Sequence, residues 1–197
     1  MDNETPQGVS DEWSTIPWRK LERYIFRLQK RIYQAKQRGD TRAVRGLKRV
    51  LKRSKAAKTL AVRQVTQDNR GKRTAGIDGI KNLTPAERLA MASKLTLEEK
   101  AAPVRRIWIP KPGKNEQRPL GIPTMMDRAR QALAKMALEP EWEAVFEPNS
   151  YGFRPGRSCH DAIEQIFIAM RKEKYVLEAD IKSDFGAPGK ARRFQRV

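Results

Sequence analysis

A one-sided block of positive charge is the feature that most constrains this chain. Residues 19–73 contain 20 Lys or Arg against only three acids, a net charge of +17 within a total of +19. A solvated helix face usually mixes both signs, because like charges at helical spacing repel each other. The segment therefore needs a polyanion to offset its self-repulsion, and this imbalance favours nucleic-acid binding.

The composition excludes several other classes of protein. The chain has 197 residues, 39% of them hydrophobic, which suffices for a core in one or two domains. No apolar run approaches the length of about 18 residues that a membrane span needs, and the first residues, MDNETPQGVSDEW, do not resemble a secretory signal. One cysteine, Cys159, and one histidine, His160, exclude a disulfide framework and a structural zinc site. We expect a cytoplasmic protein without membrane contact.

The basic segment is expected to form three amphipathic helices. Apolar residues recur every three or four positions from Leu21 to Ile32, and again from Val44 to Leu51. Gly39 and the Asp40-Thr41 pair are typical of a helix end followed by a helix start, and a third helix is expected at about 55–67. Because the bases lie between the apolar positions, they point outward. The RNA-binding candidates here are Arg19, Lys20, Arg23, Arg27, Lys30, Arg31, Lys48, Arg49, Lys52, Arg53, Arg63, Arg70, Lys72 and Arg73.

The rest of the chain is expected to mix helices and strands. A loop is expected at 69–82, a strand at 104–110, and helices starting after Thr84, Thr124 and Ser158. The middle one of these helices is expected to stop at 139–140, where Glu139 precedes a proline. We expect a buried strand at 175–181. The fold class is therefore α+β, mostly helical with a few short strands, with a break near residue 100.

Three groups of residues are candidates for chemistry. Asp180 lies near the end of the apolar run YVLEADIK, where a carboxylate can hold a divalent metal beside a phosphate. Lys111 and Arg118 flank a turn from which both can reach a triphosphate. In the segment SYGFRPGRS, Arg154 and Arg157 can bind phosphate and complete the RNA-binding candidates. Each has a structural alternative: a strand-end Asp, turn-forming Gly and Pro, and arginines that serve solubility.

The order of these segments resembles the N-terminal part of group II intron-encoded reverse transcriptases and maturases. The resemblance is carried by IPWRKLERYIFRLQKRIYQAKQRGD, LAVRQVTQDNRGKRTAGIDG, RRIWIPKPGKNEQRPLGIPTMMDRARQ, ALEPEWEAVFEPNSYGFRPGRSCHDAI and VLEADIK. It implies a reverse transcriptase N-terminal domain over 13–100 and a partial fingers and palm of a right-hand polymerase over 101–185. Residues 1–12, which precede the resemblance, are polar and are expected to form a disordered leader. Residues 186–197 form an aberrant tail without family resemblance.

The resemblance also implies a chemistry. Lys111 and Arg118 match the pair that grips the incoming triphosphate, and Asp180 matches the first catalytic Asp, an Mg²⁺ ligand joined by the backbone carbonyl of Ile181. Phe185 matches the side chain that selects deoxynucleotides. The implied reaction is RNA-directed DNA synthesis by two-metal phosphoryl transfer. The implied partners are intron or template RNA and a DNA primer or target.

The palm motif departs from the family after Phe185, which is followed by Gly186 instead of Asp. No two adjacent aspartates occur in the chain, so the Tyr-x-Asp-Asp motif is absent, and thumb and maturase sequence are not found. We therefore expect an inactive, RNA-binding, truncated reverse transcriptase. One alternative is a piece of a split enzyme completed by a second chain, or a partner of an intact maturase. The other is a basic adaptor whose interface is the acidic stretch 139–147.

Overall fold

The computed structural model describes residues 12–113 and 115–170. They form two compact units that divide between Phe146 and Glu147, and each unit is described by itself. The predicted fold class is confirmed: the described chain is mostly helical, with a single two-stranded sheet among the described residues. The leader 1–11, the expected strand 175–181 and the tail 186–197 lie outside the described residues.

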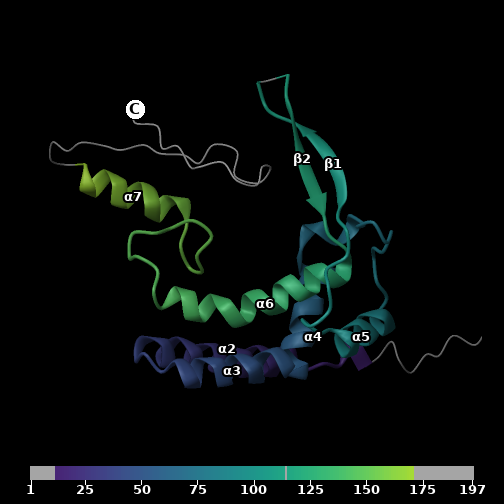
Figure 1. The fold of residues 1–197 in the computed structure, drawn as a ribbon, viewed down its shortest axis with the longest axis horizontal. Helices are drawn as coiled ribbons and strands as arrows, with labels where there is room; N and C mark the ends of the chain where they lie inside the picture. The colour runs from purple at the N-terminus through teal and green to yellow at the C-terminus, as the bar shows by residue number, and fades with distance from the viewer. Residues whose placement is uncertain (1–11, 114, 171–197) are drawn as a thin grey trace, which may run out of the picture. The chain divides into compact units, whose positions relative to one another are not determined.

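The first unit begins with a pair of helices, α2 (Trp18–Gln37) and α3 (Thr41–Arg53), which lie side by side in Figure 1. Gly39 makes the connection with a φ of +73°, the left-handed conformation that glycine adopts without strain. Asp40 then caps α3, because its carboxylate accepts a 2.8 Å hydrogen bond from the Ala43 amide. The turn expected between the first two helices is therefore confirmed.

The third helix covers the predicted range of about 55–67, but its last residues are π-helical. Helix α4 runs over Lys55–Arg63 and passes into a π-helical turn, η1 (Gln64–Asp68), and a 3-10 turn, η2 (Arg70–Arg73). Helix α5 (Pro85–Lys94) follows, and its predicted capping box is present: the Thr84 hydroxyl accepts from the Glu87 amide while the Glu87 carboxylate accepts from the Thr84 amide.

A β-hairpin follows α5. Strand β1 (Arg105–Pro110) pairs antiparallel with β2 (Gln117–Ile122), and Ile109 lies opposite Arg118. The first strand is the one expected at 104–110. The second was not expected, because Pro119 and Gly121 lower the strand propensity of QRPLGI. Both strands are edges of a two-stranded sheet, where a proline can be accommodated.

Helix α6 (Met125–Glu143) corrects the expectation that a helix stops at Glu139-Pro140. A proline inside a helix removes the hydrogen bond to the carbonyl four residues earlier, here that of Met136. Gln29 on α2 supplies the missing donor, since its side-chain Nε2 donates to the Met136 carbonyl over 2.9 Å. The helix therefore continues through a buried Pro140.

The core of the first unit lies where α6 packs against α2, α3 and α4. Figure 1 shows α6 running along the α2–α3 pair. The fully buried side chains include Ile32, Leu51 and Leu133, one from each of three helices. Trp13 is also buried and meets Trp18 edge to face, with ring centroids 5.1 Å apart, so these indoles serve packing.

The second unit contains a loop and helix α7 (Cys159–Ala169). Ser158 caps the helix through a second capping box with Asp161, as the sequence predicted. No helix within the described part of the chain is long and apolar enough to cross a membrane.

Candidate nucleic-acid interface

Most of the predicted RNA-binding side chains of α2, α3 and η2 are exposed, and together we call them the basic face. The basic face consists of Arg19, Lys20, Arg23, Arg27, Lys30, Arg31, Arg49, Lys52, Arg53, Arg70 and Arg73. Of the apolar residues between them, Ile25, Leu28 and Ile32 are buried, whereas Phe26 and Val50 are exposed. The amphipathic pattern thus holds the cations in solvent, where they can meet a polyanion.

Other predicted RNA-binding residues are engaged inside the fold. Lys48 contacts Glu141 at 2.5 Å, and Lys36 contacts the same carboxylate at 3.7 Å. These bonds lower the pKa of Glu141, with the hydrogen bond from Lys48 as the largest cause. Arg63 pairs with Glu22 at 3.1 Å and lies over the Trp18 ring. Glu141 therefore joins α6 to α2 and α3, and part of the acidic stretch 139–147 is neutralised within the unit.

The basic loop around η2 is tied to the start of α6 by Arg128. Its Nη1 donates to the Gly71 carbonyl at 2.8 Å and its Nη2 to the Thr74 carbonyl at 2.6 Å. Gly76 lies so close to Pro123 that an added Cβ would come within 2.7 Å of the Pro123 carbonyl oxygen. The loop that carries Arg70 and Arg73 is therefore held in place although it has little apolar bulk.

The hairpin brings Lys111 and Arg118 to one face. Because Ile109 opposes Arg118 and the Lys111 amide bonds to the Glu116 carbonyl, Lys111 and Arg118 lie diagonally on the same side of the ribbon. Lys111 also forms an ion pair of 2.7 Å with Glu116, and the hydrogen bond from Lys111 lowers the pKa of the Glu116 carboxyl. The sequence predicted that both bases flank a turn. The register of the hairpin shows in addition that they lie on the same face.

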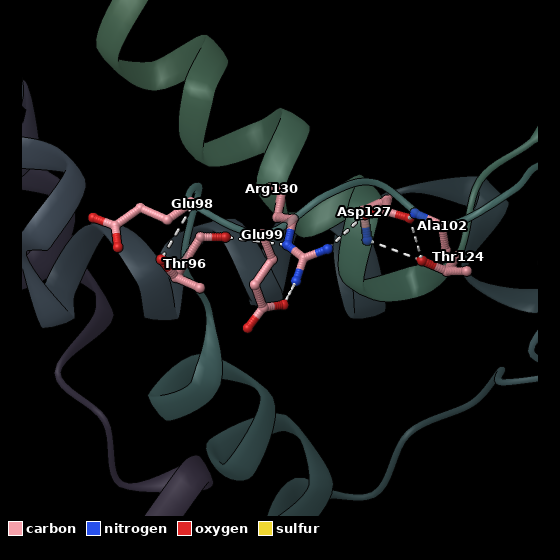
Figure 2. Close-up of polar contacts among 7 residues, drawn as sticks. All are labelled: Thr96, Glu98, Glu99, Ala102, Thr124, Asp127 and Arg130. Atoms are coloured by element: carbon pink, nitrogen blue, oxygen red, sulfur yellow. Dashed lines mark hydrogen bonds and ion pairs between the residues drawn. The ribbon is translucent and has the colours of Figure 1, made fainter.

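A buried polar network joins the base of the hairpin to α6, as Figure 2 shows. The Asp127 carboxylate accepts hydrogen bonds from the Thr124 hydroxyl at 2.8 Å, the Ala102 amide at 3.0 Å and Arg130 Nη1 at 2.8 Å. Burial raises the pKa of Asp127, but these hydrogen bonds and the charge of Arg130 outweigh burial and hold the pKa below its ordinary value of 3.8.

Arg130 extends the same network to the segment after α5. Its Nε donates to the Thr96 carbonyl at 3.1 Å, and its Nη2 pairs with Glu99. The network therefore fixes the segment 96–102, the end of the hairpin and the first turn of α6 to one another. Sequence reasoning found only the Thr124–Asp127 cap in this network, because the partners of Asp127 and Arg130 come from a distant segment.

In the second unit, Arg154 and Arg157 hold the loop before α7. Arg154 is only 8% exposed, and its Nη1 donates to the carbonyls of Glu147 and Ser150 at 2.6 and 2.9 Å. Arg157 donates to the carbonyls of Pro148 and Ser150 and lies 5.2 Å from the centroid of the Tyr151 ring. Both guanidinium groups thus have a structural role, and their contact with RNA stays a prediction.

The predicted catalytic residues Asp180, Ile181 and Phe185 lie outside the described residues. Over 12–113 and 115–170, no three His, Cys, Asp or Glu side chains gather in a way that would hold a metal ion. The described residues therefore do not by themselves provide the ligands of a catalytic metal pair.

Two family models match the chain in sequence. The N-terminal domain of reverse transcriptase matches residues 13–95, and reverse transcriptase (RNA-dependent DNA polymerase) matches residues 109–186. In this order along one chain, the two matches place it in the reverse transcriptase family.

Similar curated proteins narrow this class. The chain is 36% identical over 133 residues to protein YkfC of Escherichia coli, covering 62% of this chain and 35% of that protein. It is 45% identical over 83 residues to the group II intron-encoded protein LtrA of Lactococcus lactis, covering 42% of this chain and 14% of that protein. It is 28% identical over 184 residues to maturase-like protein 1 of Euglena gracilis, covering 85% of this chain and 38% of that protein.

The chain thus belongs to the group II intron reverse transcriptases and maturases, the family that its sequence motifs resemble. It spans between 14% and 38% of the length of these three relatives.

Proposed function

We propose that this chain binds RNA through the basic face. The observation that carries the proposal is the set of eleven exposed cations on α2, α3 and η2, while the core-facing apolar residues of α2 and α3, such as Ile25, Ile32 and Leu51, are buried. Such a surface makes phosphate contacts that set affinity and position without reading bases. The family supports RNA as the polyanion, with intron or template RNA as the substrate class.

The test is the salt dependence of RNA binding. We expect fluorescence anisotropy with a structured RNA to show an affinity that falls steeply between 50 and 200 mM salt, about 10³-fold if six phosphates are neutralised. Replacing Arg49 and Arg53 with Gln should reduce the slope of log affinity against log salt by about one for each phosphate that is no longer neutralised. Lys135→Gln on α6 is the matched control outside the basic face. Affinity that does not change with salt would overturn the proposal.

We further propose the family's division of the chain, with an N-terminal domain over 13–100 and a partial fingers and palm over 101–185. In this assignment Lys111 and Arg118 grip the incoming triphosphate, Asp180 and the Ile181 carbonyl are the ligands that remain for Mg²⁺, and Phe185 faces the sugar. A primer or target DNA is the second nucleic-acid partner.

Polymerisation by these 197 residues alone is not expected, because they contain no Tyr-x-Asp-Asp motif and no adjacent aspartates. Two metal ions need carboxylates from more than one segment to be held at one site. A primer-extension assay with Mg²⁺, template RNA and an annealed primer should give no product. Metal-dependent cDNA synthesis by the purified chain would contradict this part of the proposal.

A further inference from the structure

An open pocket of about 460 Å³ lies where η1, η2 and α5 meet. We call it the Arg88 pocket. Its lining residues are Thr66, Gln67, Lys72, Arg73, Asn82 and Arg88. Three of these residues are cations and none is an acid, so all the charged residues that line the pocket are positive.

Arg88 is the residue that marks the pocket as a binding site. Its Nε is buried and has no hydrogen-bond partner among the described residues. Its guanidinium carbon lies 6.0 Å from the centroid of the buried Trp13 ring, which anchors the side chain. Burial lowers the pKa of Arg88, against the weaker opposing charge of Glu87. An unsatisfied buried donor on a charged group is costly, and an anion in the pocket would remove that cost.

The nearby acids do not satisfy this guanidinium, because they have other partners. The Glu87 carboxylate accepts from the Thr84 amide at 2.7 Å and from the Thr84 hydroxyl at 2.9 Å. Asp68 pairs with Arg63 at 3.7 Å. The charge of Glu87 therefore offsets that of Arg88 only in part, and no acid lines the pocket.

Two further lining residues, Gln67 and Lys72, also present donors. The Gln67 side-chain oxygen accepts from Trp13 Nε1 at 3.0 Å, which leaves the two amide protons as donors. Lys72 donates one proton to the Gln67 carbonyl and retains two. Thr66 offers no donor to the pocket, because its single hydroxyl proton goes to the Val62 carbonyl at 2.7 Å. A ligand that only accepts hydrogen bonds and carries negative charge, namely an oxyanion, fits this set.

We propose that the Arg88 pocket holds one backbone phosphate of the RNA strand that the basic face attracts. The inference rests on the proposed function, and adds to it a fixed point at which the strand is held. A phosphodiester fits better than a protein carboxylate because Arg73, in the basic face, also lines the pocket, so that a chain with regularly spaced charges can occupy both.

The test follows the Arg88 Nε–H proton directly by NMR on the full chain. The Nε–H resonance is assigned by its disappearance in Arg88→Lys, a variant that retains the charge. We expect a short single-stranded RNA to shift this resonance saturably, with the midpoint matching the affinity measured by anisotropy, while sodium chloride of equal ionic strength leaves it in place. Inorganic phosphate should produce a weaker shift at millimolar concentration.

A second measurement uses variants. Arg88→Gln and Arg73→Gln should each lower RNA affinity about tenfold at 50 mM salt, and Lys135→Gln should not. If RNA binds with steep salt dependence but the Arg88 resonance stays unmoved, the inference is wrong and the proposed function stands. If RNA does not bind at all, both fail. A shift with inorganic phosphate alone would mean an adventitious ion only, and would also overturn the inference.

Discussion

Gln29 on α2 donates a 2.9 Å hydrogen bond to the backbone carbonyl of Met136 on α6, which lies four residues before Pro140. The side chain thereby replaces the amide that a proline lacks. The relationship joins two segments separated by more than a hundred residues and explains why α6 continues to Glu143.

The Gln29 contact gives the first prediction. Gln29→Ala should lower the free energy of unfolding by about 1–3 kcal/mol, because the Met136 carbonyl loses its partner in a partly buried position. In a Pro140→Ala background the helix amide is restored, and the same Gln29→Ala change should cost less than about 0.5 kcal/mol. Urea unfolding of the four proteins measures both. Gln37→Ala, which removes an exposed hydrogen bond to Tyr33, is the control. Equal costs in the two backgrounds would contradict the explanation.

The Asp127 network predicts a pH dependence. Hydrogen bonds and Arg130 hold the folded-state pKa of Asp127 below its unfolded value, so its stabilisation is complete above about pH 4 and is lost as pH falls through the folded pKa. Asp127→Asn should cost about 3 kcal/mol at pH 7. The difference in the free energy of unfolding between this variant and the unchanged protein should shrink below about pH 3. Urea unfolding at a series of pH values measures this difference in the free energy of unfolding, and Glu98→Gln is the exposed control. A difference that does not depend on pH would count against the network.

Glu141 predicts opposite effects on stability and binding. Glu141→Gln removes the ion pairs to Lys36 and Lys48, and the free energy of unfolding should fall by about 1 kcal/mol. The same change frees two lysines, so RNA affinity at low salt should rise severalfold and its salt dependence should become steeper. Fluorescence anisotropy measures the expected rise in RNA affinity, and urea unfolding of the same preparation measures the expected fall in the free energy of unfolding. Weaker RNA binding would show that these lysines do not face the strand.

The hairpin register predicts which arginine meets a nucleotide. Arg118 lies on the same face as Lys111, whereas Arg106, which pairs with Gly121, lies on the opposite face. Arg118→Gln should therefore weaken binding of a deoxynucleoside triphosphate at least threefold, and Arg106→Gln should leave it unchanged. Phosphorus NMR of dATP titrated with each protein measures the difference. Equal losses of affinity would mean that the hairpin attracts the triphosphate only by its net charge.

Local patterns were sufficient to predict the elements whose causes are local. The caps at Asp40, Thr84 and Ser158 depend on residues within three positions, and the amphipathic stripe of α2 repeats every turn. The continuation of α6 past Pro140 depends on Gln29, whose proximity no local pattern reveals. Strand β2 was missed for a related reason, because its pairing with β1 outweighs the low propensity of its proline and glycine.

The candidate site was likewise predicted only in part from the sequence. The charge imbalance pointed to the basic face, because it is a property of composition. The Arg88 pocket was not found, because its cations come from η2 and α5 and become neighbours only when the chain folds. The same holds for Arg128, which in the sequence is only one more base in an amphipathic helix.

The bonds from Arg128 to Gly71 and Thr74 have a mechanical consequence. Arg128 follows Asp127, the residue that anchors the hairpin end to α6. The η2 loop and the base of the β1–β2 hairpin are thus held by two consecutive residues of one helix, so neither can be displaced without disturbing the first turns of α6.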